Sequence, residues 1–291
     1  MVVEGVGGGV GGSQDFDIEF LEEIARRILR RVQRSLHLVI NPLCRVAVQF
    51  FLHAENGFKL TPRDLEKNID KKTKAIIFNY PTNPTGVSYT RKELNAINNV
   101  LLKHNVFCLS DEIYGDLTYD FEHTPFATLP RAKNNTLYLD GFSKSYAMTG
   151  WRVGFACGPK DIIAAMTKIH QYTIMCVSIT SQMAACEALH SGRKSVEEMK
   201  REYKRRREFV TGELSRIGLA CPKPQGAFYA FPSIKNTGLS SIEFCQRLLN
   251  DQKVAVVPGT AFGAQFNDHI RISYASSYDN LKEAMIRMKL F

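Results

Sequence analysis

The chain has 291 residues, 44% of them hydrophobic and 23% charged, which is typical of a globular protein with one large domain or two. No apolar run approaches the roughly 20 residues that a membrane-spanning helix needs, and the N-terminus lacks the basic and apolar blocks of a signal peptide. The net charge of +9 does not predict nucleic-acid binding, because the densest basic run, residues 200–207, lies among glutamates in a helical pattern.

Cysteine and histidine usage gives no sign of a disulfide framework or a metal site. The seven cysteines are an odd number and include no C-x-x-C pair, which predicts reduced thiols and a cytoplasmic location. The seven histidines show no metal-ligand spacing, so no metal is expected.

The first element in chain order is a glycine-rich segment that leads directly into an amphipathic pattern. Residues 5–12 read GVGGGVGG, and the apolar residues within 16–29 are spaced for one side of a helix. Two interpretations are open. The segment is a flexible tail, or its Gly-Ser turn begins the helix and binds an anion through free backbone N–H groups and the helix dipole.

From residue 55 onward, strand patterns alternate with helix patterns. Strands are expected at residues 74–78, 106–109, 136–139 and 153–157. The intervening helices indicate a mostly parallel α/β sheet, in which ligands bind at the carboxyl ends of the strands. Asn83, Asp111 and Lys144 each lie just past an apolar strand, which predicts one shared site.

The C-terminal third predicts a second domain. Helices are expected at residues 160–172, 180–190, 195–217, 241–250 and 278–288, and strands at residues 227–231, 254–257 and 270–274. The helix over 195–217 is long enough to connect two domains. The predicted division is a large domain over 1–190 and a connector helix with a smaller α/β domain over 191–291.

Residues 138–154, YLDGFSKSYAMTGWRVG, contain the strongest candidate site. An apolar strand breaks at a glycine, and the Ser143-Lys144 pair follows. The lysine has bulky apolar neighbours in Phe142, Tyr146, Met148 and Trp151. Such surroundings reduce the hydration of an amine and make it a usable nucleophile and base. Ser143 and Arg152 can both reach one phosphate, although a solvated surface lysine is the plainer alternative.

Two further stretches extend the pattern. Residues 79–86 read NYPTNPTG, residues 110–114 read SDEIY, and Arg271 stands in an RIS triplet. The ordered set resembles the class I and II pyridoxal-phosphate (PLP) aminotransferases, which are similar to aspartate aminotransferase and have fold type I. That family carries an Asn-Pro-x-Gly turn, an Asp-x-x-Tyr, a Ser-Lys with an arginine eight residues later, and a late Arg-x-Ser. The resemblance covers about residues 55–291.

The resemblance implies a role for each motif residue around the PLP ring. Lys144 is expected to form a Schiff base with the cofactor aldehyde and then to move the substrate α-proton. Asp111 is expected to pair with the pyridine nitrogen and keep it protonated. Tyr114 and Asn83 are expected to hydrogen-bond the ring oxygen. The plainer alternatives are a helix N-cap for Asp111 and a turn residue before Pro84 for Asn83.

The resemblance also implies how the two anionic groups are held. Ser143 and Arg152 are expected to hold the phosphate. A glycine turn grips the same phosphate in the family, and its counterpart here consists of Gly12, Ser13 and Gln14. Arg271 is expected to bind the substrate α-carboxylate through a planar two-point contact, with Asn83 beside it. A surface strand arginine is the alternative for Arg271, and Tyr80 and Tyr146 are candidates for lining the site.

The pattern departs from the family before residue 55. The family has an aromatic residue that stacks on the cofactor ring, whereas residues 40–42, INP, are followed here by LCR at 43–45. The segment that precedes the glycine turn in the family has no counterpart either. The expectation is therefore a member truncated or altered at its N-terminus, with an incomplete N-terminal part of the PLP-binding domain over 1–190.

The leading hypothesis is amino-group transfer between an amino acid and a 2-oxo acid. The alternatives are another PLP reaction on the same scaffold, such as elimination by a C–S or β lyase, and a catalytically impaired homologue. Family members are usually dimers whose sites borrow groups from the partner chain, so the resemblance also implies a homodimer, without nucleic-acid or membrane partners.

Overall fold

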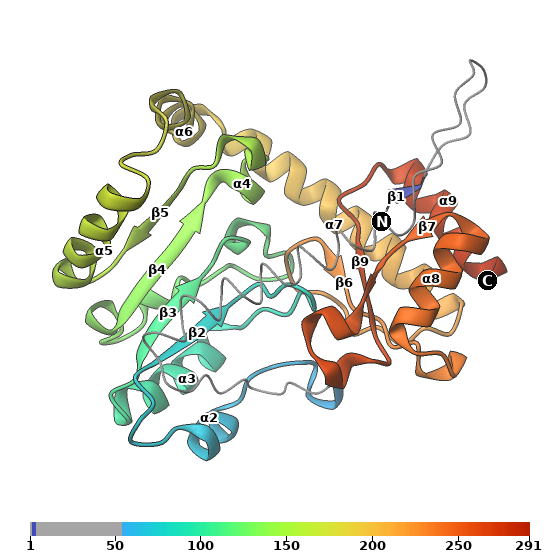
Figure 1. The fold of residues 1–291 in the computed structure, drawn as a ribbon, viewed down its shortest axis with the longest axis horizontal. Helices are drawn as coiled ribbons and strands as arrows, with labels where there is room; N and C mark the ends of the chain where they lie inside the picture. The colour runs from blue at the N-terminus through green and yellow to red at the C-terminus, as the bar shows by residue number, and fades with distance from the viewer. Residues whose placement is uncertain (1, 4–53) are drawn as a thin grey trace. The chain divides into compact units, whose positions relative to one another are not determined.

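The structure is a computed structural model that describes residues 2–3 and 54–291 (Figure 1). Residues 54–291 belong to one compact unit. The phosphate turn predicted at Gly12, Ser13 and Gln14 lies outside the described residues, as do the helix over 16–29 and the stretch 40–45. Within the described part, no helix is long and apolar enough to cross a membrane.

A four-stranded sheet carries the first group of motif residues (Figure 1). In spatial order its strands are β2 (Ala75–Asn79), β3 (Phe107–Asp111), β4 (Thr136–Gly141) and β5 (Gly154–Cys157). The first three run parallel, as predicted, whereas β5 runs antiparallel because the chain turns back and pairs Gly154 with Gly141. The register pairs Asn79 with Asp111 and Asp111 with Leu139, so the carboxyl ends of the parallel strands meet at one edge.

The helices begin near the residues that the sequence patterns indicate. They are α2 (Pro62–Asn68), α3 (Arg91–Lys103), α4 (Phe142–Ser145), α5 (Lys160–Thr173), α6 (Ile179–Ser191), α7 (Arg193–Arg216), α8 (Ser241–Gln252) and α9 (Tyr278–Leu290). Thr61 and Thr90 accept hydrogen bonds from the third residue of α2 and α3, and those residues, Asp64 and Glu93, bond back to the cap. These reciprocal bonds satisfy N–H groups that a helix start otherwise leaves free.

Short 3-10 helices occupy several of the connections. They are η1 (Ala54–Asn56), η2 (Gly115–Leu117), η3 (Phe126–Thr128), η4 (Lys133–Asn135), η5 (Thr149–Trp151), η6 (Lys235–Thr237), η7 (Gly259–Phe262) and η8 (Ala264–Phe266). η2 directly follows the Asp-x-x-Tyr motif, and η5 lies between the Ser-Lys pair and its arginine. Both therefore set the course of loops that carry motif residues.

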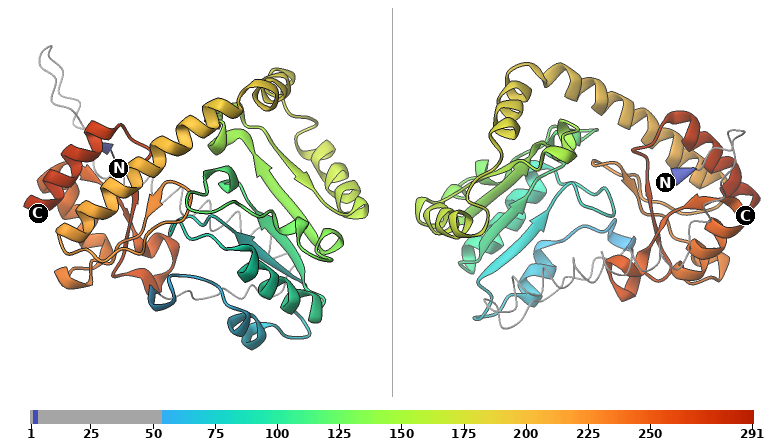
Figure 2. Two further views of the ribbon diagram at one scale, coloured as in Figure 1. Left: turned by 180° about the vertical axis from the view of Figure 1, so that it is seen from behind. Right: turned by 45° about the horizontal axis from the view of Figure 1, so that its top comes forward.

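The C-terminal part has a three-stranded antiparallel sheet in the order β6 (Tyr229–Ala230), β9 (Ile270–Ser273) and β8 (Val257–Pro258). The strand expected at 254–257 is divided, because β7 (Val254–Ala255) pairs instead with β1 (Val2–Val3). Helices α8 and α9 pack with α7 around this sheet (Figure 2). The shared core is made by buried apolar side chains such as Val210, Leu214, Phe244, Leu248, Ile270, Ile272, Leu281 and Met285.

The turn at residues 82–86 packs against the chain that leads into β6. The N–H groups of Gln225 and Gly226 both donate to the carbonyl oxygen of Gly86, at 2.7 and 2.9 Å. Gly86 has φ of +69°, and a Cβ there would lie 2.9 Å from the carbonyl oxygen of Tyr229. Glycine permits both this backbone conformation and this approach. The Asn-Pro-x-Gly turn is therefore hydrogen-bonded to the chain that enters β6, although the two segments are far apart in sequence.

Helix α7 is fixed to the first part of the chain by a buried arginine. The guanidinium of Arg207 is fully buried and donates to both carboxylate oxygens of Asp120, at 2.6 and 2.9 Å. It also donates to the carbonyl oxygen of Pro224 at 2.7 Å. A two-point, charge-assisted pair of this kind restrains orientation as well as distance, so α7 holds the approach to β6 in place.

Candidate active site

Asn79, the last residue of β2, links the signature turn to the end of β3. Its side-chain Nδ2 donates to the carbonyl oxygen of Asp111 at 3.1 Å. Its Oδ1 accepts from the backbone N–H of Asn83 at 3.1 Å. The asparagine at the start of the NYPTNPTG stretch thus orients both predicted residues. No motif predicted a role for Asn79, although its position at the carboxyl end of a strand is typical of a ligand-binding residue.

Asp111 lies half-buried at the carboxyl end of β3. Burial raises the pKa of its carboxyl; the N–H of Ile113, which donates to Oδ1 at 3.3 Å, opposes the rise, and the neighbouring Glu112 adds to it. The bond to Ile113 forms a local Asx turn, and η2 has Tyr114 at its N-cap position without a side-chain cap. The helix N-cap alternative for Asp111 is therefore wrong. A desolvated carboxyl in this place suits pairing with a cationic nitrogen.

Glu112, beside Asp111, is fully buried and holds the loop after β3. Its Oε1 accepts from the hydroxyl of Ser110 at 2.6 Å and from the N–H of Phe126 at 2.9 Å. Its Oε2 lies 2.6 Å from Nε2 of His123. A buried carboxylate needs such partners. Glu112 therefore supports the loop that follows Asp111.

Lys144 projects from α4, half-buried, with Nζ 6.0 Å from the ring centroid of Phe228. Within residues 54–291 its amine makes no hydrogen bond or ion pair. The predicted apolar surroundings are only partly correct. Phe142 and Met148 are buried, but the side chain of Trp151 is 47% exposed. The ring that faces the amine is instead that of Phe228, just before β6, which no local motif around the lysine indicates.

Tyr114 is buried, and its hydroxyl lies 3.1 Å from the hydroxyl of Tyr229 on β6. Burial raises the pKa of Tyr114 well above its usual value, and the positive charge of Arg271 opposes that rise. The phenol therefore stays protonated and can donate a hydrogen bond. Tyr229 is a site residue that the sequence analysis missed, because a tyrosine inside an apolar strand is typical of a core position.

Arg271 lies on β9 with its guanidinium in contact with two aromatic rings. The guanidinium carbon is 4.6 Å from the centroid of Tyr229 and 5.0 Å from that of Phe262. Its Nη1 donates to Oδ1 of Asn83 at 2.9 Å, and its buried Nε has no partner among the described residues. Burial lowers the pKa of Arg271. A desolvated guanidinium with an unused N–H is suited to a carboxylate, and the surface-arginine alternative is wrong.

The two predicted phosphate ligands lie on either side of η5. Ser143 is half-buried in α4, next to Lys144. Arg152 is exposed, has a left-handed backbone with φ of 53°, and donates from Nη1 to the carbonyl oxygen of Thr149 at 2.9 Å. The structure places Ser143 in α4 and Arg152 directly after η5, so their joint role in holding a phosphate stays a prediction.

The two tyrosines proposed as lining residues differ. Tyr80 is fully buried, and its hydroxyl donates to the carbonyl oxygen of Thr124 at 2.9 Å, so its assignment to the site is wrong. Tyr146 is half-buried, with its ring centroid 5.3 Å from that of Phe142. Its place beside α4 leaves the lining role as a prediction.

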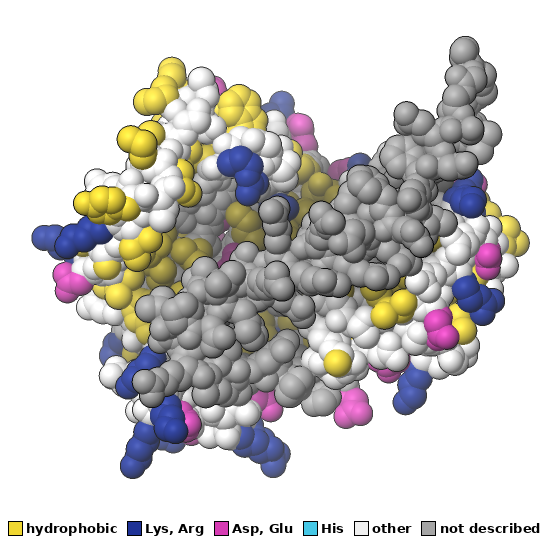
Figure 3. Space-filling view, in the orientation of Figure 1, with side chains coloured by type: hydrophobic (Ala, Val, Ile, Leu, Met, Phe, Trp, Pro, Cys, Tyr) yellow, Lys and Arg dark blue, Asp and Glu magenta, His cyan; other side chains and the backbone are white. Residues whose placement is uncertain are grey.

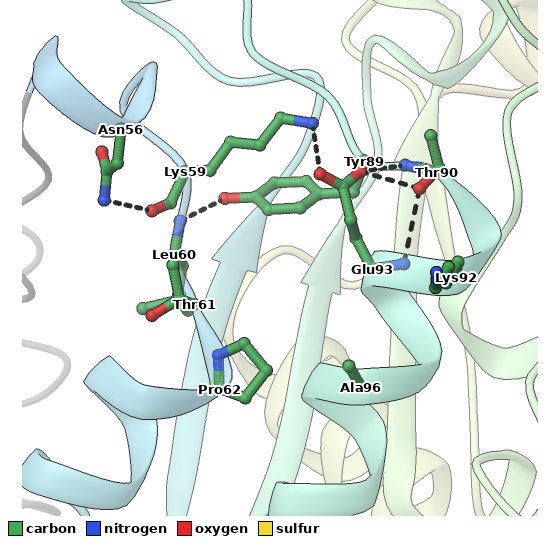
Figure 4. A pocket seen from close by; sticks show the side chains of 10 residues that line it. All are labelled: Asn56, Lys59, Leu60, Thr61, Pro62, Tyr89, Thr90, Lys92, Glu93 and Ala96. Carbon is green, nitrogen blue, oxygen red and sulfur yellow. Dashed lines mark hydrogen bonds and ion pairs between the residues drawn. The ribbon is translucent and has the colours of Figure 1, made fainter.

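A separate recess of about 630 Å³ lies between the starts of α2 and α3 (Figure 4). Lys59 and Glu93 form an ion pair across it at 2.7 Å, and the hydroxyl of Tyr89 accepts from the N–H of Leu60 at 2.8 Å. The polar groups seen in Figure 4 thus largely satisfy one another. None of the predicted site residues lines this recess.

The motif residues from the two sheets therefore form one continuous set of contacts. It runs from Asn83 to Arg271, through the ring and hydroxyl of Tyr229 to Tyr114, and through Phe228 to Lys144. The sequence profile of the family "Aminotransferase class I and II" matches residues 35–288. The chain belongs to this family. The predicted fold, a mostly parallel sheet flanked by helices, is confirmed.

Two relatives in Bacillus subtilis illustrate the similarity. A putative aminotransferase, YugH, is 50% identical over 246 residues, which are 84% of this chain and 64% of the relative. A probable N-acetyl-LL-diaminopimelate aminotransferase is 45% identical over 81% of this chain and 60% of its own length. The chain thus spans less than two thirds of the length of these aminotransferases.

Solved structures of the family superpose on the same part. The aromatic aminotransferase from Pyrococcus horikoshii has a TM-score of 0.81 at 43% identity, over 84% of this chain and 66% of that one. Aspartate aminotransferase from Thermus thermophilus, solved with maleate, has a TM-score of 0.79 at 36% identity, over 84% and 64%.

Aminotransferases of this family use PLP in general, and the described residues of this chain fit that group. The amine of Lys144 is unpaired within 54–291, Asp111 presents a desolvated carboxyl, and Tyr114 is a buried phenol. Ser143 and Arg152 supply hydroxyl and guanidinium donors for a phosphate. An aldehyde, a ring nitrogen, a ring oxygen and a phosphate each have a counterpart of suitable chemistry.

Proposed function

We propose that this chain forms the catalytic part of a PLP-dependent aminotransferase that moves an amino group between an amino acid and a 2-oxo acid. The observation that carries the proposal is the continuous set of contacts that joins Lys144, Tyr114, Arg271 and Asn83, with Asp111 tied to it through Asn79. The names of the relatives differ in substrate, so the proposal is made at the level of amino and 2-oxo acids.

Bound PLP supplies an electron sink for the carbanion that forms when a substrate α-proton leaves. Lys144 would hold the cofactor aldehyde through Nζ, and once the substrate amine displaces it, the same amine would take the substrate α-proton and pass it to the cofactor carbon. Asp111 keeps the ring nitrogen protonated, because a carboxylate beside that nitrogen favours its charged form. Tyr114 donates its hydroxyl to the ring oxygen.

The remaining residues hold and orient the two reactants. Arg271 binds the α-carboxylate with the N–H groups that Asn83 leaves free, and Asn83 keeps the guanidinium at a fixed angle. Ser143 and Arg152 hold the phosphate, with Gly12, Ser13 and Gln14 as the proposed glycine turn. Fixing both reactants in this way removes much of the entropic cost of bringing them together, and this saving is a large share of enzymatic rate enhancement.

The test separates transfer from the alternative reactions. The protein is loaded with PLP, the visible absorption of the bound cofactor is recorded, and amino donors are added one at a time. Loss of the band that a 2-oxo acid reverses is expected for a transaminase. Release of ammonia and an oxo acid from a single substrate points to a lyase, and an unchanging band points to an impaired homologue.

We further propose a cytoplasmic homodimer in which α7 connects a PLP-binding part, residues 1–190, to a smaller part, residues 191–291. The dimer is supported by exposed apolar side chains on α5 and α6, which Figure 3 shows gathered on the part of the surface where these helices lie. This α5–α6 apolar face consists of Ile162, Met166, Ile169, Tyr172, Ile179 and Met183. An apolar stripe on a helix normally faces a core or a partner.

A further inference from the structure

Two adjacent aromatic residues on and before β6 contact three groups of the candidate site. The ring of Phe228 lies 6.0 Å from Nζ of Lys144, and its centroid is 5.5 Å from that of Tyr114. The hydroxyl of Tyr229 lies 3.1 Å from that of Tyr114, and its ring lies 4.6 Å from the guanidinium carbon of Arg271. Of these two residues, it is Tyr229 that contacts both a cofactor-binding residue, Tyr114, and a substrate-binding residue, Arg271.

We propose that Tyr229 is a positioning residue that couples the carboxylate-binding guanidinium of Arg271 to the cofactor-facing hydroxyl of Tyr114. The proposal rests on the proposed function, because it takes the roles of Arg271 and Tyr114 from it. No motif of the family resemblance includes Tyr229.

Only one direction of the hydrogen bond between the hydroxyls of Tyr114 and Tyr229 leaves Tyr114 free to donate to the cofactor. A tyrosine hydroxyl has a single O–H to donate. When Tyr114 donates that hydrogen to the ring oxygen, its bond with Tyr229 requires Tyr229 to be the donor. Donation into Tyr114 polarises its O–H and strengthens its own hydrogen bond, because successive hydrogen bonds reinforce one another in a low-dielectric interior. Tyr229 is only 7% exposed, which keeps water from taking its place.

The ring of Tyr229 acts on Arg271 through its face. The guanidinium contacts the rings of Tyr229 and Phe262 and donates to Asn83, so these three contacts restrain it before a carboxylate arrives. The charge of Arg271 is felt at Tyr114, where it opposes the rise in the pKa of the phenol. A carboxylate that neutralises Arg271 therefore changes the electrostatic environment of Tyr114, and Tyr229 contacts both residues.

The test uses two substitutions that remove different halves of Tyr229. Tyr229→Phe keeps the ring under Arg271 and removes the hydroxyl, whereas Tyr229→Leu removes the ring as well. Tyr203→Phe is the matched control, since its ring lies 5.4 Å from that of Phe228 but carries the guanidinium of Arg206 rather than that of Arg271. Each PLP-loaded protein is titrated with pH by its visible absorption and with maleate by equilibrium binding.

For Tyr229→Phe, we expect the pH midpoint of the visible band to rise by about 0.5 to 1 unit, the equivalent of one weakened hydrogen bond to the ring oxygen. The rise is expected to vanish when Tyr114→Phe is already present, because the partner hydroxyl is then gone. For Tyr229→Leu, we expect maleate to bind about 3- to 30-fold more weakly, the range of a cation–π contact. Tyr203→Phe is expected to change neither quantity.

Two results would overturn the coupling. One is a midpoint shift of Tyr229→Phe that persists unchanged in the Tyr114→Phe background. The other is wild-type maleate affinity in a folded Tyr229→Leu protein, as judged by its thermal unfolding. Failure of the proposed function looks different, since the wild-type protein then shows no visible band with PLP, or a band that no amino donor or 2-oxo acid changes.

Discussion

The guanidinium of Arg271 contacts two aromatic rings and donates to Asn83, and these contacts set the cost of replacing it. Lysine at this position keeps the charge but offers neither a planar face to Tyr229 and Phe262 nor a two-point edge to a carboxylate. We expect Arg271→Lys to weaken maleate binding to the PLP-loaded protein by roughly 10- to 100-fold, the value of a charge-assisted hydrogen bond.

The matched control for that measurement is Arg287→Lys. Arg287 also combines partial burial with a polar partner, because it pairs with Glu283 on α9 at 2.8 Å. Its substitution is expected to leave maleate binding unchanged. Equal losses in both variants would mean that Arg271 has no special place in carboxylate binding.

Asp140, at the end of β4, is held in an environment that favours its neutral form. Its carboxyl accepts from the hydroxyl of Tyr138 at 2.7 Å and from the N–H of Gly141 at 2.6 Å. Burial raises its pKa to about 6 from 3.8; these two bonds oppose the rise, and the carboxylates of Asp116 and Glu112 add to it. The folded state therefore binds this proton more tightly than the unfolded chain does.

It follows that Asp140 makes the fold less stable as pH rises from about 4 through 6. Asparagine has nearly the same shape and no charge to desolvate, so the advantage of Asp140→Asn grows over this interval and levels off above pH 7. We expect a gain in the free energy of unfolding of about 1 to 3 kcal/mol at pH 7.5 and little difference at pH 4, measured in urea. Asp251→Asn, at an exposed position of α8, controls for the loss of one negative charge. A gain that is the same at both pH values would refute this account of Asp140.

At the scale of elements, the site depends on the contact between the 82–86 turn and the chain entering β6. A Cβ at Gly86 would lie 2.5 Å from Cβ of Pro224 and 2.9 Å from the carbonyl oxygen of Tyr229. Gly238 has almost the same φ, +70° against +69°, but open space around its Cβ position. Alanine at Gly238 therefore tests backbone strain alone, whereas alanine at Gly86 adds steric overlap to the same strain.

We expect Gly238→Ala to lower the free energy of unfolding by about 1 to 2 kcal/mol through its left-handed backbone alone. Gly86→Ala is expected to lose about 1 to 3 kcal/mol more, because the turn and β6 must move apart. Chemical denaturation of both variants measures the difference. Equal losses would show that the approach of the turn to β6 is unimportant for stability.

The same elements show what the sequence could predict and where it stopped. Asn83, Asp111 and Lys144 were predictable because each follows an apolar strand, and the parallel register then brings strand ends together. Tyr229 and Phe228 were not, because their role comes from the packing of β6 against the turn, which is a contact between distant parts of the chain. Tyr80 was misassigned because its nearness in sequence to the turn does not reveal that its hydroxyl points inward to Thr124.

At the scale of the whole molecule, the α5–α6 apolar face bears on assembly. Ile162, Met166 and Ile169 recur at the spacing of one helical face, yet none of the side chains of α5 is buried. We expect the wild-type protein to sediment as a dimer and the variant Ile169→Glu with Met183→Glu to sediment as a monomer, because the new charges must be desolvated in the interface. Ile242→Glu, an exposed position on α8, is the control. A double variant that remains dimeric would place the interface elsewhere.

The central claim is that one amine, that of Lys144, holds the cofactor in this chain. The most direct measurement is to load the protein with PLP, reduce it with borohydride, digest it and locate the modified lysine by mass spectrometry. We expect the adduct on the peptide that contains Lys144, its loss in Lys144→Ala, and its retention in Lys160→Ala, which changes an exposed lysine at the start of α5. An adduct on a different lysine of the wild-type protein, or one that persists in Lys144→Ala, would contradict the account.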